Sequence, residues 1–176
     1  VAEFGAGALA TDSVQEPAGF DRRVHDTHTD GEDVAASQRY QATVVKRVAE
    51  GLRNAGVPLL AGFALRDSGD AGMGVLSRDG DRKRAFDALA SAYEPIQATL
   101  ADPGASESDV LVHNALDTRF TGELQWESPA GSGSTEVTID TNARAALTTI
   151  ELPAEGAVTL TLSTADRTVE NTYALG

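Results

Sequence analysis

The sequence contains no cysteine, two lysines and 5% aromatic residues. The absence of cysteine excludes a disulfide scaffold, an iron–sulfur centre, a thiolate zinc site and a cysteine nucleophile. No apolar run approaches the roughly 20 residues that span a bilayer. The first residues also lack the basic and apolar stretches of a signal peptide. We therefore expect a cytoplasmic protein with no membrane partner.

Positive charge is scarce as well. The chain carries 14 basic and 27 acidic residues in 176, which gives a formal net charge of −13. Binding to a phosphate backbone requires clustered cations, so no nucleic-acid partner is expected. The acids are dispersed along the chain, which is typical of a solvated anionic surface suited to concentrated salt, as in a halophile. An ordinary acidic cytosolic protein is the alternative.

Residues 1–95 mix helical and strand patterns. Apolar residues at helical spacing predict a helix that begins after Asp33 and ends before Gly56. The continuous apolar run 59–65 predicts a strand that is covered on both faces of a parallel sheet. A second helix is predicted over 81–93, and Pro95 marks a boundary. This order indicates β–α units with a parallel sheet.

Residues 96–176 show strand patterns only. Seven short strands, separated by turn signals such as Ala130-Gly131-Ser132-Gly133, predict an immunoglobulin-like β-sandwich. Trp126 shares a face with Leu124 and is expected in the core, although a tryptophan on a strand can also stack on a sugar. His113 alternates with apolar residues and is expected to be structural.

Two sets of residues are candidates for chemistry. Glu3 ends a short apolar segment, at the position where α/β barrels collect catalytic carboxylates, although a surface carboxylate is the simpler interpretation. His25 and His28 lie in a long polar segment and are residue types that zinc accepts. No metal-binding motif surrounds them, so we expect no metal and no cofactor.

Several ordered segments resemble one enzyme family. Ala2-Glu3-Phe4-Gly5-Ala6 resembles the nucleophile-bearing seventh strand of retaining glycoside hydrolases of the (β/α)₈ clan, especially family 2, which includes β-galactosidases, β-glucuronidases and β-mannosidases. Residues 40–52 resemble the seventh helix of that barrel, 57–65 the eighth strand, and 74–86 the run into the last helix. The resemblance implies the C-terminal portion of a (β/α)₈ barrel over 1–95, with two β–α units, followed by the sandwich over 96–176.

The resemblance also implies roles for individual residues. Glu3 would be the nucleophile in hydrolysis of a β-linked sugar, and the side chains expected to contact the substrate are Phe4, His25, His28, Phe63, Arg66 and Asp67. A retaining mechanism needs a second carboxylate roughly 5 Å from the first. In the family that glutamate follows an asparagine on the fourth barrel strand, which this chain does not contain. The tryptophan common near the end of the eighth strand is also missing, and Phe63, Arg66 and Asp67 occupy that region.

A complete barrel needs about 250 residues, so the 176-residue chain is expected to be inactive alone. Its partners would be a carbohydrate substrate and the remainder of the barrel, supplied by the same parent chain or by a partner chain. The alternative is a non-catalytic β-sandwich accessory or interaction module, of a carbohydrate-binding kind, in which Glu3 is incidental.

Overall fold

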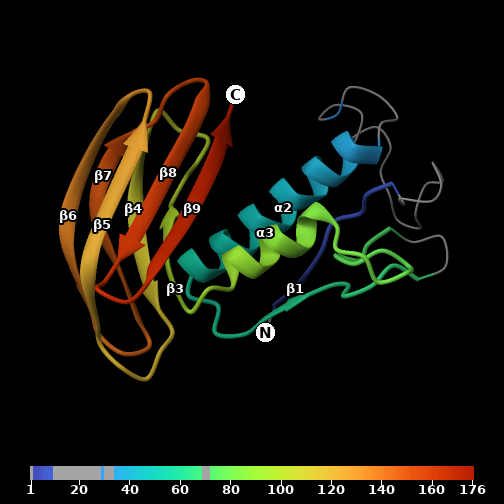
Figure 1. Cartoon of the computed structure of the whole chain (residues 1–176), viewed down its shortest axis with the longest axis horizontal. Helices are drawn as coiled ribbons and strands as arrows, with labels where there is room; N and C mark the ends of the chain where they lie inside the picture. The colour runs from blue at the N-terminus through green and yellow to red at the C-terminus, as the bar shows by residue number, and fades with distance from the viewer. Residues whose placement is uncertain (1, 10–28, 30–33, 69–71) are drawn as a thin grey trace. The chain divides into compact units, whose positions relative to one another are not determined.

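The computed structural model describes residues 2–9, 29, 34–68 and 72–176 (Figure 1). Contacts divide the chain into two units, Val1–Tyr93 and Glu94–Gly176. The first unit contains β1 (Ala2–Phe4), α2 (Val34–Asn54), β2 (Leu60–Gly62) and α3 (Arg84–Ala92). Both predicted helices are confirmed, whereas the predicted cap Asp33 lies outside the described residues.

The strands of the first unit form a two-stranded parallel sheet. Glu3 of β1 is in register with Ala61 of β2, and Phe4 with Gly62. A small core of Val45, Val75 and Ala85 packs against Phe4 and against side chains of α3. The prediction of a strand over 59–65 covered on both faces is wrong, because β2 has three residues and Leu59, Phe63 and Leu65 are exposed. The apolar run therefore does not indicate burial in this chain.

The second unit is a β-sandwich, as predicted. One sheet has the order β3 (Ile96–Leu100), β4 (Glu107–Asn114), β7 (Ala143–Glu151); the other has the order β6 (Gly131–Ile139), β5 (Phe120–Ser128), β8 (Gly156–Ser163), β9 (Thr168–Leu175). All neighbouring strands are antiparallel. Alternate residues such as Leu124, Val158, Leu160 and Leu162 point into the core between the sheets.

The segment predicted as the turn 130–133 is mostly strand. Ser128 is in register with Gly131, so the turn is a two-residue hairpin and β6 begins at Gly131. A Cβ atom at Gly133 would lie 2.3 Å from the Trp126 ring, so glycine is needed in this strand to accommodate the indole. Trp126 packs against the sandwich core, as predicted. His113 is buried in β4, and its Nε2 lies 3.1 Å from Thr99 Oγ1, which agrees with its predicted structural role.

Candidate functional site

The two faces of the β1–β2 sheet differ. Phe4 packs against the core formed with the helices, and its register partner Gly62 lies against Leu89 of α3. Because side chains alternate along a strand, Glu3 and its partner Ala61 point to the opposite face. Both Glu3 and Ala61 are exposed. The sheet therefore presents a carboxylate on the face that the helices do not cover.

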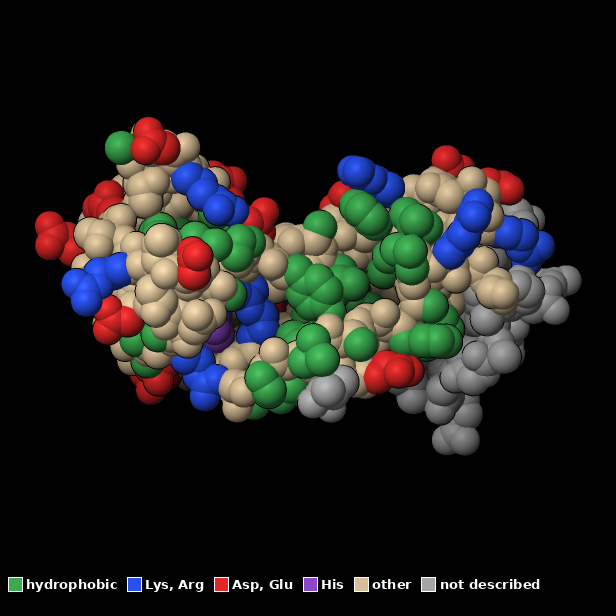
Figure 2. Space-filling view, turned by 90° about the horizontal axis from the view of Figure 1, so that it is seen from below, with side chains coloured by type: hydrophobic (Ala, Val, Ile, Leu, Met, Phe, Trp, Pro, Cys, Tyr) green, Lys and Arg blue, Asp and Glu red, His purple; other side chains and the backbone are tan. Residues whose placement is uncertain are grey.

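Phe63 follows β2 and is held by the segment after β1. Its N–H donates to the Phe4 carbonyl at 2.7 Å, and its carbonyl lies so close to Gly5 that a Cβ atom there would be 2.0 Å from the oxygen. The Phe63–Ala64 peptide bond is cis. The Phe63 side chain is 53% exposed, and hydrophobic side chains are open on the surface of this unit in Figure 2. An exposed aromatic ring is a suitable surface for the apolar face of a sugar.

Arg66 and Asp67 lie in the loop after β2 and have different surroundings. Arg66 is exposed, and its guanidinium group lies beside Gly80, where a Cβ atom would be 3.4 Å from Nη2. Asp67 is buried, with Oδ1 accepting from the Gly74 N–H at 2.7 Å and from Lys83 Nζ at 3.2 Å. The structure thus places the Asp67 carboxylate in a buried ion pair with Lys83 rather than on an open surface.

The two predicted histidines, His25 and His28, lie outside the described residues. Among the remaining predicted residues, the structure brings Glu3, Phe4 and Phe63 together on β1 and at the end of β2, where backbone contacts connect them. No group of three or more metal-ligating side chains occurs within the described part of the chain. Neither described helix is long and apolar enough to cross a bilayer.

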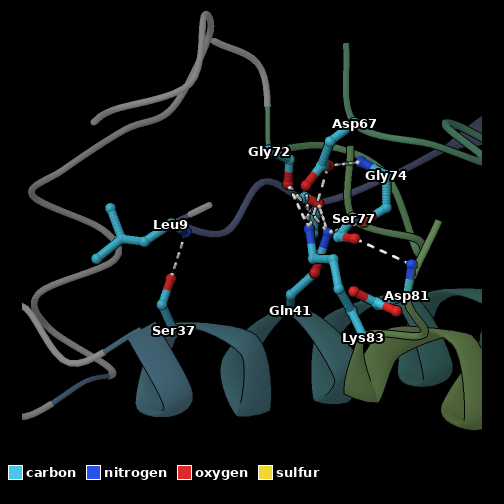
Figure 3. A network of polar contacts seen from close by, with 10 residues as sticks. Leu9, Ser37, Gln41, Asp67, Gly72, Gly74, Ser77, Asp81 and Lys83 are labelled. Carbon is cyan, nitrogen blue, oxygen red and sulfur yellow. Dashed lines mark hydrogen bonds and ion pairs between the residues drawn. The ribbon is translucent and has the colours of Figure 1, made fainter. Parts of the chain in front are cut away.

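A buried polar network lies next to this sheet (Figure 3). Gln41 of α2 donates from Nε2 to the Ala6 carbonyl at 2.8 Å, and also reaches the carbonyls of Gly72 and Gly74 at 3.3 and 3.2 Å. Lys83, just before α3, donates to Gly72 and to both Asp67 oxygens. The network therefore connects the segment after β1, helix α2 and the loop after β2.

Sequence reasoning did not single out Gln41 or Lys83. Two features of the sequence could have indicated them. Gln41 is a polar residue on the buried side of α2, and Lys83 is one of two lysines in the chain. Burial lowers the pKa of the Lys83 ammonium group, and the neighbouring Asp67 carboxylate partly opposes this shift. A lysine buried in this way holds its position only when its charge is paired and hydrogen-bonded.

Comparisons with known proteins give the context of this geometry. No family model matches the chain, and no curated protein matches it by sequence. Solved structures match it in fold: a β-D-mannosidase from Dictyoglomus thermophilum has a TM-score of 0.76, 15% identity and 99% coverage of this chain. The exo-chitosanase CsxA from Amycolatopsis orientalis has a TM-score of 0.69, 17% identity and 86% coverage.

The chain is similar in fold to part of a glycosidase. It spans 27% of the length of the β-mannosidase and 21% of the exo-chitosanase. The first of these proteins is named a β-D-mannosidase, and CsxA is also named an exo-β-D-glucosaminidase. The likeness in fold agrees with the resemblance to family 2 glycoside hydrolases seen in residues 2–6. At 15% and 17% identity, the likeness concerns the fold.

Proposed function

We propose that this chain is the C-terminal portion of a retaining glycoside hydrolase of the family 2 type that acts on β-linked sugars. In this proposal β1, α2, β2 and α3 are the last two β–α units of the (β/α)₈ catalytic barrel, and the sandwich follows it. The observation that carries the proposal is the exposed Glu3 carboxylate on a parallel strand, on the face turned away from the helices. In a complete barrel that face is the interior, and catalytic groups lie at the C-terminal ends of its strands.

Glu3 is the nucleophile of the proposed mechanism. It attacks the anomeric carbon while a second carboxylic acid protonates the leaving oxygen, and the same second group then activates water to release the sugar. That second group comes from a strand outside this chain, so the 176-residue chain alone does not complete the reaction. Phe63 offers its exposed ring to one face of the sugar, and Arg66, His25 and His28 are the further side chains proposed to contact it. The predicted contact of Phe4 with the substrate is not retained, because its side chain packs against the core on the face opposite Glu3.

The proposal is tested in the intact enzyme that contains this chain. A 2-deoxy-2-fluoro-β-glycoside slows both steps of a retaining mechanism. An activated leaving group such as 2,4-dinitrophenolate keeps the first step faster than the second, so the sugar stays bound to the nucleophile. Mass spectrometry is expected to find the added mass on the peptide with Glu3, and Glu3→Gln is expected to abolish both labelling and turnover. Glu136→Gln, which changes an exposed glutamate of the sandwich, serves as the matched control and keeps full activity. Labelling at another residue, or turnover by the isolated chain, refutes the proposal.

The alternative function is carbohydrate binding by the sandwich, and one feature favours it. The outer face of the β6–β5–β8 sheet has a shallow pocket of about 410 Å³ whose lining includes Gln125, Glu127, Ser134, Thr159 and Thr161. Amide and hydroxyl groups of this kind form hydrogen bonds with sugar hydroxyls. Calorimetric titration of the chain with β-linked oligosaccharides of mannose or glucosamine tests this alternative, which predicts binding that Gln125→Ala weakens and Glu3→Gln does not.

A further inference from the structure

The carbonyl oxygen of Gly72 accepts hydrogen bonds from three N–H donors in three parts of the first unit, of which Gln41 and Lys83 are labelled in Figure 3. The Ala8 N–H donates at 3.0 Å, Gln41 Nε2 at 3.3 Å and Lys83 Nζ at 3.2 Å. These donors come from the segment after β1, from α2 and from the residue before α3. One backbone atom of the loop after β2 is therefore fixed against both flanking helices and the neighbouring strand segment.

Lys83 also forms an ion pair next to the Gly72 carbonyl. Its ammonium group pairs with Asp67, and the side chains are 1% and 5% exposed. Asp67 in turn accepts the Gly74 N–H at 2.7 Å. Removing two charges from water is costly, and the ion pair offsets that cost only when its geometry is well defined and its remaining hydrogen bonds are made. Two hydrogen bonds to the loop after β2 meet that condition: Lys83 Nζ donates to the Gly72 carbonyl, and the Gly74 N–H donates to Asp67.

The path from this ion pair to Phe63 is short. The segment 73–75, which begins next to Gly72, pairs with Ala64: the Ala64 N–H donates to Met73 and the Val75 N–H donates to Ala64, at 3.1 and 3.0 Å. Ala64 follows Phe63 directly, and the Phe63 N–H is bonded to Phe4 on the other side. The backbone that carries the exposed Phe63 ring is therefore hydrogen-bonded at two places. Phe63 bonds to Phe4 of β1, and Ala64 bonds to the segment 73–75, which follows Gly72.

We propose that Lys83 is a positioning residue of the glycosidase site, which fixes the Phe63 ring beside the strand of Glu3 through Asp67 and the segment 73–75. This inference rests on the proposed function, in which Phe63 binds one face of the sugar. Lys83 does not touch the substrate in this scheme. Without Lys83 the Phe63 ring is less firmly positioned, and substrate binding is weakened.

The kinetic test uses Lys83→Met and Phe63→Ala, singly and together, in the intact enzyme. A binding surface that acts equally on substrate and transition state changes KM while kcat stays constant. We expect Lys83→Met to raise KM for an aryl β-glycoside roughly tenfold or more, and Phe63→Ala to do the same. In the Phe63→Ala background Lys83→Met is expected to have no further effect on KM, because Lys83 acts through Phe63.

The controls separate positioning from folding. Arg84→Met removes a neighbouring exposed cation at the start of α3 and is expected to leave both constants unchanged. A purely structural role of Lys83 lowers kcat by reducing the folded fraction and leaves KM unchanged. That result, or a full additional rise of KM in the double variant, overturns the proposal.

A measurement without turnover keeps this inference separate from the proposed function. The chain has five phenylalanines, so 4-fluorophenylalanine labelling gives five ¹⁹F resonances, which phenylalanine-to-leucine variants assign. In Lys83→Met the Phe63 resonance is expected to shift and broaden, whereas that of Phe120, buried in the sandwich, stays unchanged. An unchanged Phe63 resonance in a folded Lys83→Met chain refutes positioning even if the enzyme is a glycosidase. A changed resonance in a protein without glycosidase activity refutes the proposed function alone.

Discussion

The backbone of Gly5 lies directly against the carbonyl group of Phe63. A Cβ atom at position 5 would be 2.0 Å from the Phe63 oxygen and 3.1 Å from its carbon. Because the obstructing atoms belong to the backbone, no change of side-chain rotamer can make room for a larger residue. Glycine at this position therefore allows the exit from β1 and the end of β2 to approach each other.

Gly5→Ala is expected to destabilise the first unit by about 1–3 kcal/mol, the usual cost of overpacking. Gly51→Ala is the matched control, since nothing lies within 4 Å of a Cβ atom there. It replaces an exposed helical glycine and is expected to stabilise by about 0.5–1 kcal/mol. Urea unfolding followed by circular dichroism at 222 nm reports on α2 and α3, while fluorescence of Trp126, the only tryptophan, reports on the sandwich. Equal midpoints for the two variants would contradict the contact.

The buried ion pair predicts a pattern of single and double substitutions. Lys83→Met leaves the buried Asp67 carboxylate without its cation and is expected to cost about 3–5 kcal/mol. Adding Asp67→Asn is expected to recover most of that loss, because the amide oxygen still accepts the Gly74 N–H and no buried charge remains. The helical signal in urea unfolding compares the parent chain, Lys83→Met and the double variant. A double variant less stable than Lys83→Met would contradict this account.

Asn114 closes the connection between β4 and β5. Its Nδ2 donates to the carbonyls of Thr118, Ile139 and Asp140 at 2.7, 3.2 and 3.0 Å, and its Oδ1 accepts the Leu116 N–H at 3.0 Å. Asn114→Ala is expected to destabilise the sandwich by about 2–3 kcal/mol, since buried backbone groups lose their partner. Asn114→Asp is expected to be at least as harmful at neutral pH, because its second oxygen then faces three carbonyls.

Unfolding in urea, followed by Trp126 fluorescence, measures the effect at Asn114. Thr138→Ala, an exposed change on β6, is the control and is expected to stay within 0.5 kcal/mol or so of the parent. If Asn114→Asp were as stable as the parent at pH 7, the assigned direction of the amide group would be wrong.

The carboxyl group of Glu123 has a pKa below its ordinary value of 4.5, because the side chains of Gln125 and Ser134 donate hydrogen bonds to it. The ionised form is favoured in the folded chain, so the associated stability is present above pH 4.5 and is lost as the pH falls through the lower folded value. Gln125→Ala is expected to raise the pKa of Glu123 toward 4.5, as followed by ¹³C NMR of its carboxyl carbon. Thr121→Ala should leave it unchanged, and an unchanged pKa in Gln125→Ala would rule out that hydrogen bond.

Local patterns predicted much of this fold. The apolar stripe of α2 and the alternation of Leu160 and Leu162 in β8 depend on residues close in sequence, and both elements are present in the structure. The run 59–65 was misinterpreted because its burial depends on which elements lie on either side of the sheet. Gly133 was taken as part of a turn because its role depends on Trp126, which lies opposite it on the neighbouring strand.

In the candidate site, too, some features depend on neighbouring residues in the sequence and others on distant ones. Glu3 was predicted as a site residue from five adjacent residues, whereas the buried position of Asp67 depends on Lys83, sixteen positions away. The contribution of Gln41 depends on carbonyl groups 31 to 35 positions away. No short-range pattern contains contacts of this length, so the ion pair of Asp67 with Lys83 could not be predicted from the sequence.

The convergence on the Gly72 carbonyl also bears on how the first unit folds. Its Gln41 and Lys83 partners are separated from it by 31 and 11 positions, and Gln41 also bonds Ala6 at a separation of 35. Closing such loops costs chain entropy before the hydrogen bonds form and stabilise the chain, and a high contact order slows folding. The helices can form early from local contacts. The loop after β2 reaches its final conformation only when α2, the segment after β1 and Lys83 have come together. Maturation of the aromatic surface at Phe63 is therefore expected among the last steps of the folding reaction.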